Sequence, residues 1–111
     1  MSDTLTMTDT EILDQIKAET AENRVFLYLK GTPDAPRCGF SNQVVQILNI
    51  TGAEFGSRDV LTDPRIREVL AEHSDWPTIP QLFVDGKLVG GCDITTEMYQ
   101  NGELQELLGS K

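Results

Sequence analysis

The sequence predicts an α/β fold built on a mixed sheet of four strands with helices on both faces. A continuous apolar run at residues 25–29 precedes a helical pattern and a second strand pattern, which together make a parallel βαβ unit. Asp85-Gly86, between two short apolar runs, predicts a β-hairpin. Helical patterns at the start, middle and end of the chain supply the cover for both faces.

The first half of the chain should run helix, strand, loop, helix, strand. Thr8 and Glu11 fit a capping box, and the helix they open fades at Asn23. The strand at 25–29 leads into residues 30–37, where a glycine and two prolines predict irregular structure.

A second helix should follow the loop and reach about Ile50, where Gly52 is suited to cap it. Residues 54–60 have the pattern of a second strand. Because the two strands flank one helix, they should be parallel with a right-handed crossover.

The second half should contain a helix, a hairpin and two closing helices. Asp63-Pro64 starts a helix, and the prolines within residues 76–80 end it. The hairpin strands are expected at 81–84 and 87–89. Asp93 is placed to cap the next helix, and a short last helix closes the chain. This order of elements is thioredoxin-like.

Length and charge set limits on the class of protein. The 111 residues suffice for one domain, which we place at 9–111 after a flexible tail at 1–8. The net charge of −9 argues against nucleic acid and anionic membranes as partners. No apolar run has membrane-spanning length, and the N-terminus does not resemble a secretory signal. Two cysteines with no secreted scaffold indicate a reducing compartment, such as bacterial cytoplasm, or an organellar matrix if the chain is processed.

Cys38 is the leading candidate for chemistry because it lies at or just before a helix N-terminus. Backbone N–H groups and the helix dipole favour a thiolate there, and Lys30 and Arg37 are close in sequence. An inert loop cysteine is the alternative. Ser41 occupies the position where a dithiol protein has its second cysteine. Cys38 should therefore either form a mixed disulfide with a small thiol or bind something as a thiolate ligand.

Two further positions allow a functional and a structural interpretation. Cys92, beside a Gly-Gly pair, is at least as consistent with a small buried residue as with a redox role, and a bridge to Cys38 stays open. Ile79-Pro80 is a candidate cis peptide whose bend would free the Ile79 backbone to pair with an extended peptide. A rigid turn explains it equally well. His73 is interpreted as a surface residue at a helix end.

Taken together, several motifs resemble the monothiol glutaredoxins of the CGFS type. They are Cys-Gly-Phe-Ser at 38–41, Lys30-Gly-Thr-Pro33, Trp76-Pro-Thr-Ile-Pro80, Gln81-Leu-Phe-Val-Asp-Gly86 and Gly90-Gly-Cys-Asp-Ile94. The resemblance runs from about residue 9 to the end and is to the short, single-domain form. It implies a glutaredoxin domain, glutathione as a ligand, and a [2Fe-2S] cluster shared by two subunits. Cys38 would be the one protein ligand from each subunit.

The resemblance also implies roles in binding glutathione. Lys30 and Arg67 would bind its glycine carboxylate, and the Ile79 backbone would pair with its cysteinyl part. Cys92 and Asp93 would hold the γ-glutamyl end. For Arg67, an ordinary solvated position on a helix is the alternative.

The expected function is iron–sulfur cluster transfer or assembly by a cluster-bridged homodimer acting on client or assembly proteins. The alternative is a glutathione-dependent thiol–disulfide oxidoreductase working through Cys38 alone, and such activity is expected to be weak at most. A third possibility is an adaptor that binds partners through its acidic surface.

Overall fold

The computed structural model describes residues 8–109 of the chain. Within them, no helix is long and apolar enough to cross a membrane. The elements in chain order are α1 (Asp9–Glu22), β1 (Val25–Leu29), β2 (Gly31–Thr32), β3 (Ala35–Pro36), α2 (Gly39–Thr51), β4 (Gly56–Asp59), a 3-10 turn η2 (Val60–Thr62), α3 (Pro64–Ser74), β5 (Gln81–Val84), β6 (Lys87–Gly90), α4 (Cys92–Asn101) and α5 (Glu103–Gly109).

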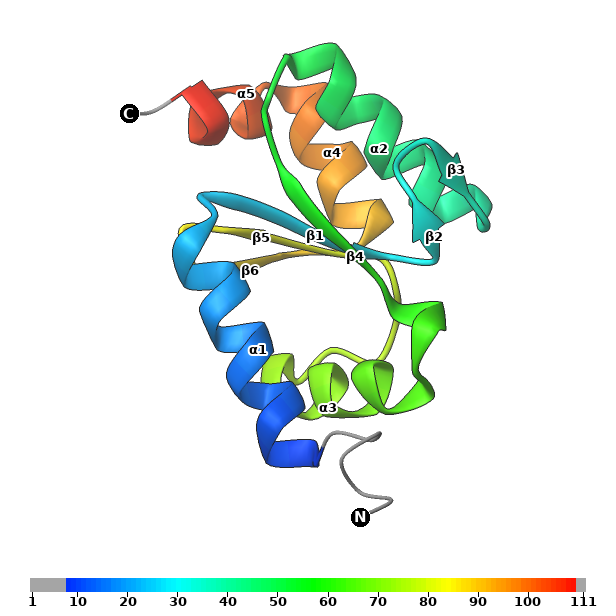
Figure 1. The fold of residues 1–111 in the computed structure, drawn as a ribbon. Coiled ribbons are helices and arrows are strands. Elements are labelled where there is room, and N and C mark those ends of the chain that lie inside the picture. Colours follow the sequence, from blue (N-terminus) through cyan, green and yellow to red (C-terminus); the bar gives the residue numbers. More distant parts are fainter. Residues whose placement is uncertain (1–7, 110–111) are drawn as a thin grey trace.

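A four-stranded mixed sheet in the order β4-β1-β5-β6 forms the centre of the molecule. β1 and β4 are parallel, whereas β1–β5 and β5–β6 are antiparallel. Helices α1 and α3 cover one face, and α2, α4 and α5 cover the other (Figure 1). The predicted α/β, thioredoxin-like class is therefore confirmed, including the parallel βαβ unit and the hairpin.

The central strand β1 explains why both faces need helices. All five of its residues are buried. Val25, Leu27 and Leu29 pack into the core beneath α2, α4 and α5. Phe26 and Tyr28 pack into the second core beneath α1 and α3. Successive side chains of a strand point to opposite faces, so an uninterrupted apolar run belongs in a sheet that is covered on both sides.

A hydrogen-bonded set of polar side chains lies at the second core. The hydroxyl of Tyr28 donates a hydrogen bond to Oε1 of Glu19 at 2.9 Å, and Glu19 also pairs with the guanidinium of Arg58. These contacts join α1, β1 and β4. Burial, together with the Glu19 charge, raises the pKa of Tyr28, which therefore stays a neutral donor.

Most of the predicted element boundaries are confirmed. Thr8 and Glu11 make both hydrogen bonds of the capping box. Gly52 caps α2 in the left-handed conformation, with φ 77°. The Asp63 side chain accepts from the N–H of Arg65 at the start of α3.

Three boundary predictions were wrong. Residues 30–37 are not irregular throughout: β2 and β3 pair as a short ribbon, which Figure 1 shows beside α2. Gly31 permits it because its φ is 93° and a Cβ there would lie 2.6 Å from the Ala35 carbonyl. The strand expected at 54–60 is only Gly56–Asp59, since η2 turns the chain toward α3.

The third error concerns the start of α4. Asp93 does not cap this helix: Gly91 is the N-cap and Asp93 lies within the first turn. The predicted tail at 1–8 lies outside the described residues, except for Thr8.

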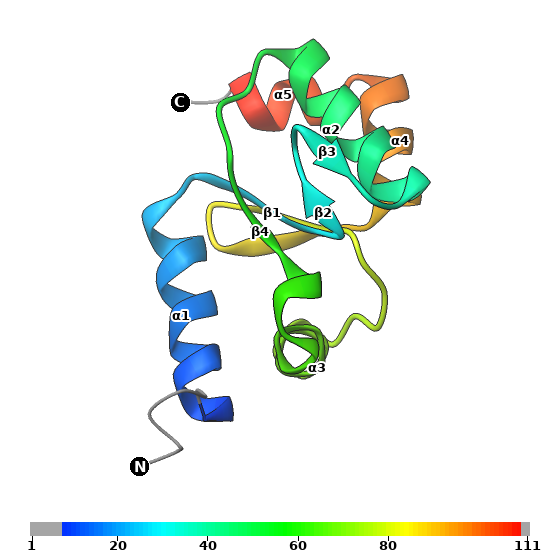
Figure 2. The ribbon, with the colours of Figure 1, turned by 45° about the vertical axis from the view of Figure 1, so that its right-hand side comes forward.

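Seen from a second direction, α3 is viewed end-on beneath the sheet, on the side opposite α2 and α4 (Figure 2).

Candidate active site

A pocket of about 580 Å³ brings together all six residues that the sequence marked as a site. It lies where α2 and α4 begin and where the loop at 76–80 leads into β5. Its lining includes Lys30, Cys38, Arg67, Ile79, Cys92 and Asp93. Segments far apart in the sequence thus converge at one end of the sheet, which is typical of ligand sites in this class of architecture.

Cys38 is the N-cap of α2 and is partly exposed. The backbone N–H of Ser41 is the main group that lowers the pKa of its thiol, with help from the N–H of Phe40 and the charge of Lys30. These N–H groups have no partner within the helix, so they stabilise an anion at this position. Arg37, which the sequence suggested as a further cause, is not among the groups that shift this pKa.

Ser41 does more than fill a first-turn position. Its side chain is fully buried, and its Oγ accepts a hydrogen bond from the N–H of Lys30 at 3.1 Å. The hydroxyl also contributes to the lowered pKa of Cys38. Ser41 therefore fixes the Lys30 backbone against the start of α2, a role that the sequence pattern did not reveal.

Cys92 has the opposite environment. Its side chain is buried, and burial raises the pKa of its thiol, as do the charges of Asp93 and Cys38. Its Sγ lies 3.9 Å from Oγ1 of Thr96. That hydroxyl accepts a hydrogen bond from Gln43 of α2 at 2.8 Å, which links the two helices. Both cysteines are free thiols.

The loop at 76–80 forms one wall of the pocket. The Ile79-Pro80 peptide is cis, as the sequence suggested. The side chain of Ile79 is 7% exposed and packs in the core beneath α1 and α3. Among residues 8–109, the Ile79 backbone makes no hydrogen bond. Its peptide groups are therefore available to an extended ligand, while the side chain holds the residue in place.

The charged residues of the pocket have no ion-pair partner in the part of the chain that the structure describes. Among the described residues, none of Lys30, Arg67 and Asp93 takes part in an ion pair. By contrast, the ion pairs elsewhere join Arg24 to Asp85, Arg58 to Glu19 and Arg65 to Asp63. Two free cations and one free carboxylate in one pocket suit a ligand that carries both signs of charge.

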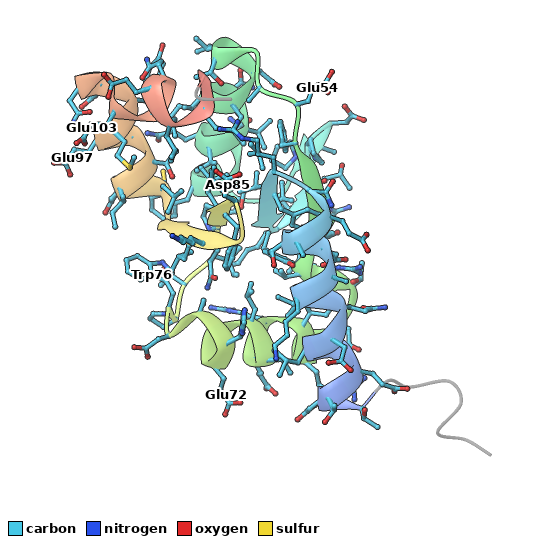
Figure 3. The ribbon with its side chains drawn as sticks, turned by 90° about the vertical axis from the view of Figure 1, so that its left-hand side faces the viewer. Glu54, Glu72, Trp76, Asp85, Glu97 and Glu103 are labelled. Carbon is cyan, nitrogen blue, oxygen red and sulfur yellow. The ribbon has the colours of Figure 1, made fainter. Side chains whose placement is uncertain are left out.

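Other lining residues were not predicted. The pocket also includes Phe40, Trp76, Thr78, Pro80, Gly91 and Ile94. Figure 3 shows Trp76 on the loop between α3 and β5. A Cβ at Gly91 would lie 3.3 Å from Nε1 of Trp76 and 3.2 Å from the Pro80 carbonyl. Glycine therefore lets the loop and the start of α4 approach this closely, whereas a side chain at position 91 would require its neighbours to shift by a few tenths of an ångström.

Within the described part of the chain, no three His, Cys, Asp or Glu side chains are grouped so that they could hold a metal ion. The pocket presents the Cys38 thiol, whose pKa is lowered, and the buried Cys92 thiol, whose pKa is raised, with charged side chains around them.

These features define a thioredoxin-like thiol protein with a single activated cysteine. The profile of the Glutaredoxin family matches residues 25–89. The chain is 53% identical over 96 residues to glutaredoxin 4 of Escherichia coli (strain K12), covering 86% of this chain and 84% of that protein. It is 51% identical over 102 residues to a probable monothiol glutaredoxin 2 of Rickettsia felis, covering 92% and 98%.

The fold comparison agrees. The solution structure of reduced, apo GrxS14 from poplar superposes with a TM-score of 0.73 and 48% identity, covering 92% of this chain and 91% of that one. The chain belongs to the glutaredoxin family, and its relatives include monothiol members. The family suggested by the sequence motifs is thus confirmed.

Proposed function

We propose that this protein binds glutathione and carries a [2Fe-2S] cluster between two subunits, for delivery to iron–sulfur client or assembly proteins. One observation carries the proposal: an activated Cys38 faces a pocket with unpaired charges, while a buried serine occupies position 41. Such a thiol has no partner one helical turn away, and the other thiol of the pocket, Cys92, is buried and has a raised pKa, so a small thiol from outside the chain is the favoured partner.

The pocket supports glutathione as the source of that thiol. Lys30 and Arg67 would bind the glycine carboxylate through charge-assisted hydrogen bonds. The free Ile79 backbone would pair with the cysteinyl unit. The N–H groups at the start of α4, including that of Cys92, would receive the γ-glutamyl carboxylate, and Asp93 its ammonium group.

The donor set also suits a cluster as cargo. A [2Fe-2S] cluster requires four thiolates. Cys38 offers one thiolate per chain, so two subunits and two glutathione molecules would complete the set. A cluster held partly by exchangeable small molecules can be handed on, which suits transfer in a reducing compartment such as a bacterial cytoplasm or an organellar matrix.

The lowered pKa of Cys38 also favours a second candidate function. In that reaction the Cys38 thiolate attacks the glutathionyl sulfur of a mixed disulfide and releases the other thiol. A second glutathione thiolate then attacks the Cys38–glutathione disulfide, releasing oxidised glutathione and restoring Cys38. Ser41 cannot resolve the Cys38–glutathione disulfide, so in this reaction a second glutathione would take the place of the missing thiol.

Anaerobic reconstitution with iron, sulfide and glutathione separates the two functions. We expect the parent protein to develop the absorption of a [2Fe-2S] cluster. Cys38→Ser should lose it completely, because a ligand is removed from a partly exposed position without loss of a core contact. Cys92→Ser should retain it, since Cys92 is not a proposed ligand.

Sedimentation provides the second measurement. The apo protein should be a monomer, because two chains of net charge −9 repel each other, and the cluster-loaded form a dimer. A colourless parent that still turns over glutathione mixed disulfides would favour the oxidoreductase. Equal loss of cluster in both cysteine variants would contradict Cys38 as the sole protein ligand.

A further inference from the structure

We infer that Gln81 is a positioning residue that fixes the ligand-pairing backbone of Ile79 in place. This inference rests on the proposed glutathione site. Gln81 is the first residue of β5, a strand whose other residues are apolar. Its side chain is fully buried.

The side-chain amide of Gln81 commits both of its N–H groups to the pocket loop. Nε2 donates to the carbonyl of Trp76 at 2.8 Å and to that of Thr78 at 3.2 Å. These two carbonyls belong to the stretch of backbone that leads directly to Ile79. One amide therefore links the beginning and the middle of the loop to the rigid sheet.

The loop has few other attachments. The Trp76 N–H donates to the Ala71 carbonyl at 3.2 Å, at the end of α3. From there to β5, the described residues give the loop no further backbone–backbone hydrogen bond. The buried residues Ile79 and Pro80 and the packing of Trp76 against Gly91 also hold the loop, but the Gln81 amide is the side chain that hydrogen-bonds its backbone to the sheet.

The cost of this arrangement supports a specific role. Oε1 of Gln81 is buried and has no hydrogen-bond partner within the described residues. Burying an unpaired polar atom is unfavourable, and an apolar residue of similar size would avoid it. The glutamine is therefore poorly explained as core filling and well explained by its two donors.

The position of the loop also determines the far wall of the pocket. Trp76 packs against Gly91, so a shift of the loop changes its contact with the start of α4. Gln81 thus holds two proposed glutathione contacts, the Ile79 backbone and the Cys92 N–H, at a fixed separation. It does so without touching the ligand.

The test compares Gln81→Met, which keeps the size but removes both donors, with Gln81→Glu, which places acceptors opposite two carbonyls. Gln105→Met is the matched control: Gln105 also donates to a backbone carbonyl, that of Tyr99 at 3.1 Å, but outside the pocket. Val84→Ala controls for lost stability, since Val84 is buried in the same strand and packs in the opposite core.

Two quantities are measured on each apo protein. Glutathione affinity is obtained by NMR titration. Loop order is obtained from the fluorescence anisotropy of Trp76, which is the single tryptophan of the chain. We expect Gln81→Met to bind glutathione about tenfold more weakly, as for the loss of one or two hydrogen bonds, and to lower the anisotropy. Gln81→Glu should bind glutathione more weakly still. Gln105→Met should match the parent, and Val84→Ala should melt earlier but keep its affinity.

Parent-like affinity and anisotropy in Gln81→Met would overturn the inference. So would a loss of affinity in Val84→Ala equal to that in Gln81→Met, because the effect would then follow stability alone. If Gln81→Glu does not fold, Gln81→Met decides by itself. A parent that fails to bind glutathione would instead overturn the proposed function, and unchanged anisotropy would still count separately against Gln81.

Discussion

The two cysteines of this protein both lie at the start of a helix, yet their thiol pKa values move in opposite directions. The pKa of Cys38, at the start of α2, is lowered by the backbone N–H groups of Ser41 and Phe40. The pKa of Cys92, at the start of α4, is raised by burial. Proximity to a helix N-terminus therefore does not by itself make a reactive thiolate.

The two cysteines differ in two ways: their positions relative to the start of the helix are one residue apart, and their thiols differ in access to solvent. Cys38 is the N-cap, so its thiol lies near N–H groups of the first turn that have no helical partner and that lower its pKa, although its side chain makes no capping hydrogen bond. Cys92 is already inside the first turn, where its Sγ faces Thr96 instead. Cys38 is also partly exposed, whereas Cys92 is buried. A thiolate needs both the donors and the solvent.

The largest expected effect of this contrast is on alkylation. At neutral pH we expect iodoacetamide to modify Cys38 at least about ten times faster than Cys92, because only the thiolate reacts and Cys92 is also shielded. Peptide mass spectrometry on timed samples of the reduced protein measures both rates.

Urea supplies the control for alkylation. In the unfolded chain neither thiol keeps its environment, so the two rates should converge. Equal rates in the folded protein would show that the helix positions do not distinguish the two thiols.

A pair of glycine variants should produce an intermediate effect. Gly91→Ala places a methyl group 3.2 Å from the Pro80 carbonyl and 3.3 Å from Nε1 of Trp76, so the walls of the pocket must separate. We expect a loss of about 1–3 kcal/mol in the free energy of unfolding, as for other overpacked sites, together with weaker glutathione binding. Gly39→Ala has open space around the added methyl group. Its stability should stay within about 1 kcal/mol of the parent.

Urea unfolding measures both glycine variants. The comparison contrasts the start of α4, which is packed against the loop, with the start of α2, which is open. Equal stability of Gly91→Ala and Gly39→Ala would mean that the loop moves away freely, and that Trp76 does not hold the pocket wall.

The order of elements could be predicted because each depends on a local pattern. The apolar run of β1, the capping box of α1 and the Asp85-Gly86 turn each specify their own structure. The β2–β3 ribbon was missed because it depends on the carbonyl of Ala35 folding back over Gly31, a contact that no periodicity records. The start of α4 was misplaced because Asp93 is a good capping residue and Gly91 caps without a side chain.

The site was predictable where its chemistry resides in unusual residues, such as Cys38 at the start of a helix and the Ile79-Pro80 bend. Its supporting contacts were not. Ser41 and Gln81 are ordinary residues whose roles arise from burial and from hydrogen bonds to distant or irregular backbone. The sequence did contain one indication of the role of Gln81. It is a polar residue at the start of an otherwise apolar strand, where burying an amide without hydrogen-bond partners would destabilise the fold.

The smallest expected effect is the dependence of stability on pH, and its sign should differ between the two thiols. The pKa of Cys38 is lowered in the folded state, so its stabilising contribution is present above the unfolded value and is lost as pH falls through the folded pKa. The pKa of Cys92 is raised, so its contribution is present below the unfolded value and is lost as pH rises through the folded pKa. The ordinary value for both thiols is 9.0.

Urea unfolding of the reduced parent, Cys38→Ser and Cys92→Ser between about pH 7 and about pH 10 measures these contributions. The stability of the parent relative to Cys38→Ser should increase with pH, and its stability relative to Cys92→Ser should decrease. Lysine and tyrosine titrations are common to all three proteins, so they cancel in the two differences. If the two differences change in the same direction, the environments of the thiols are not opposite, and the contrast between the N-cap of α2 and the first turn of α4 does not hold.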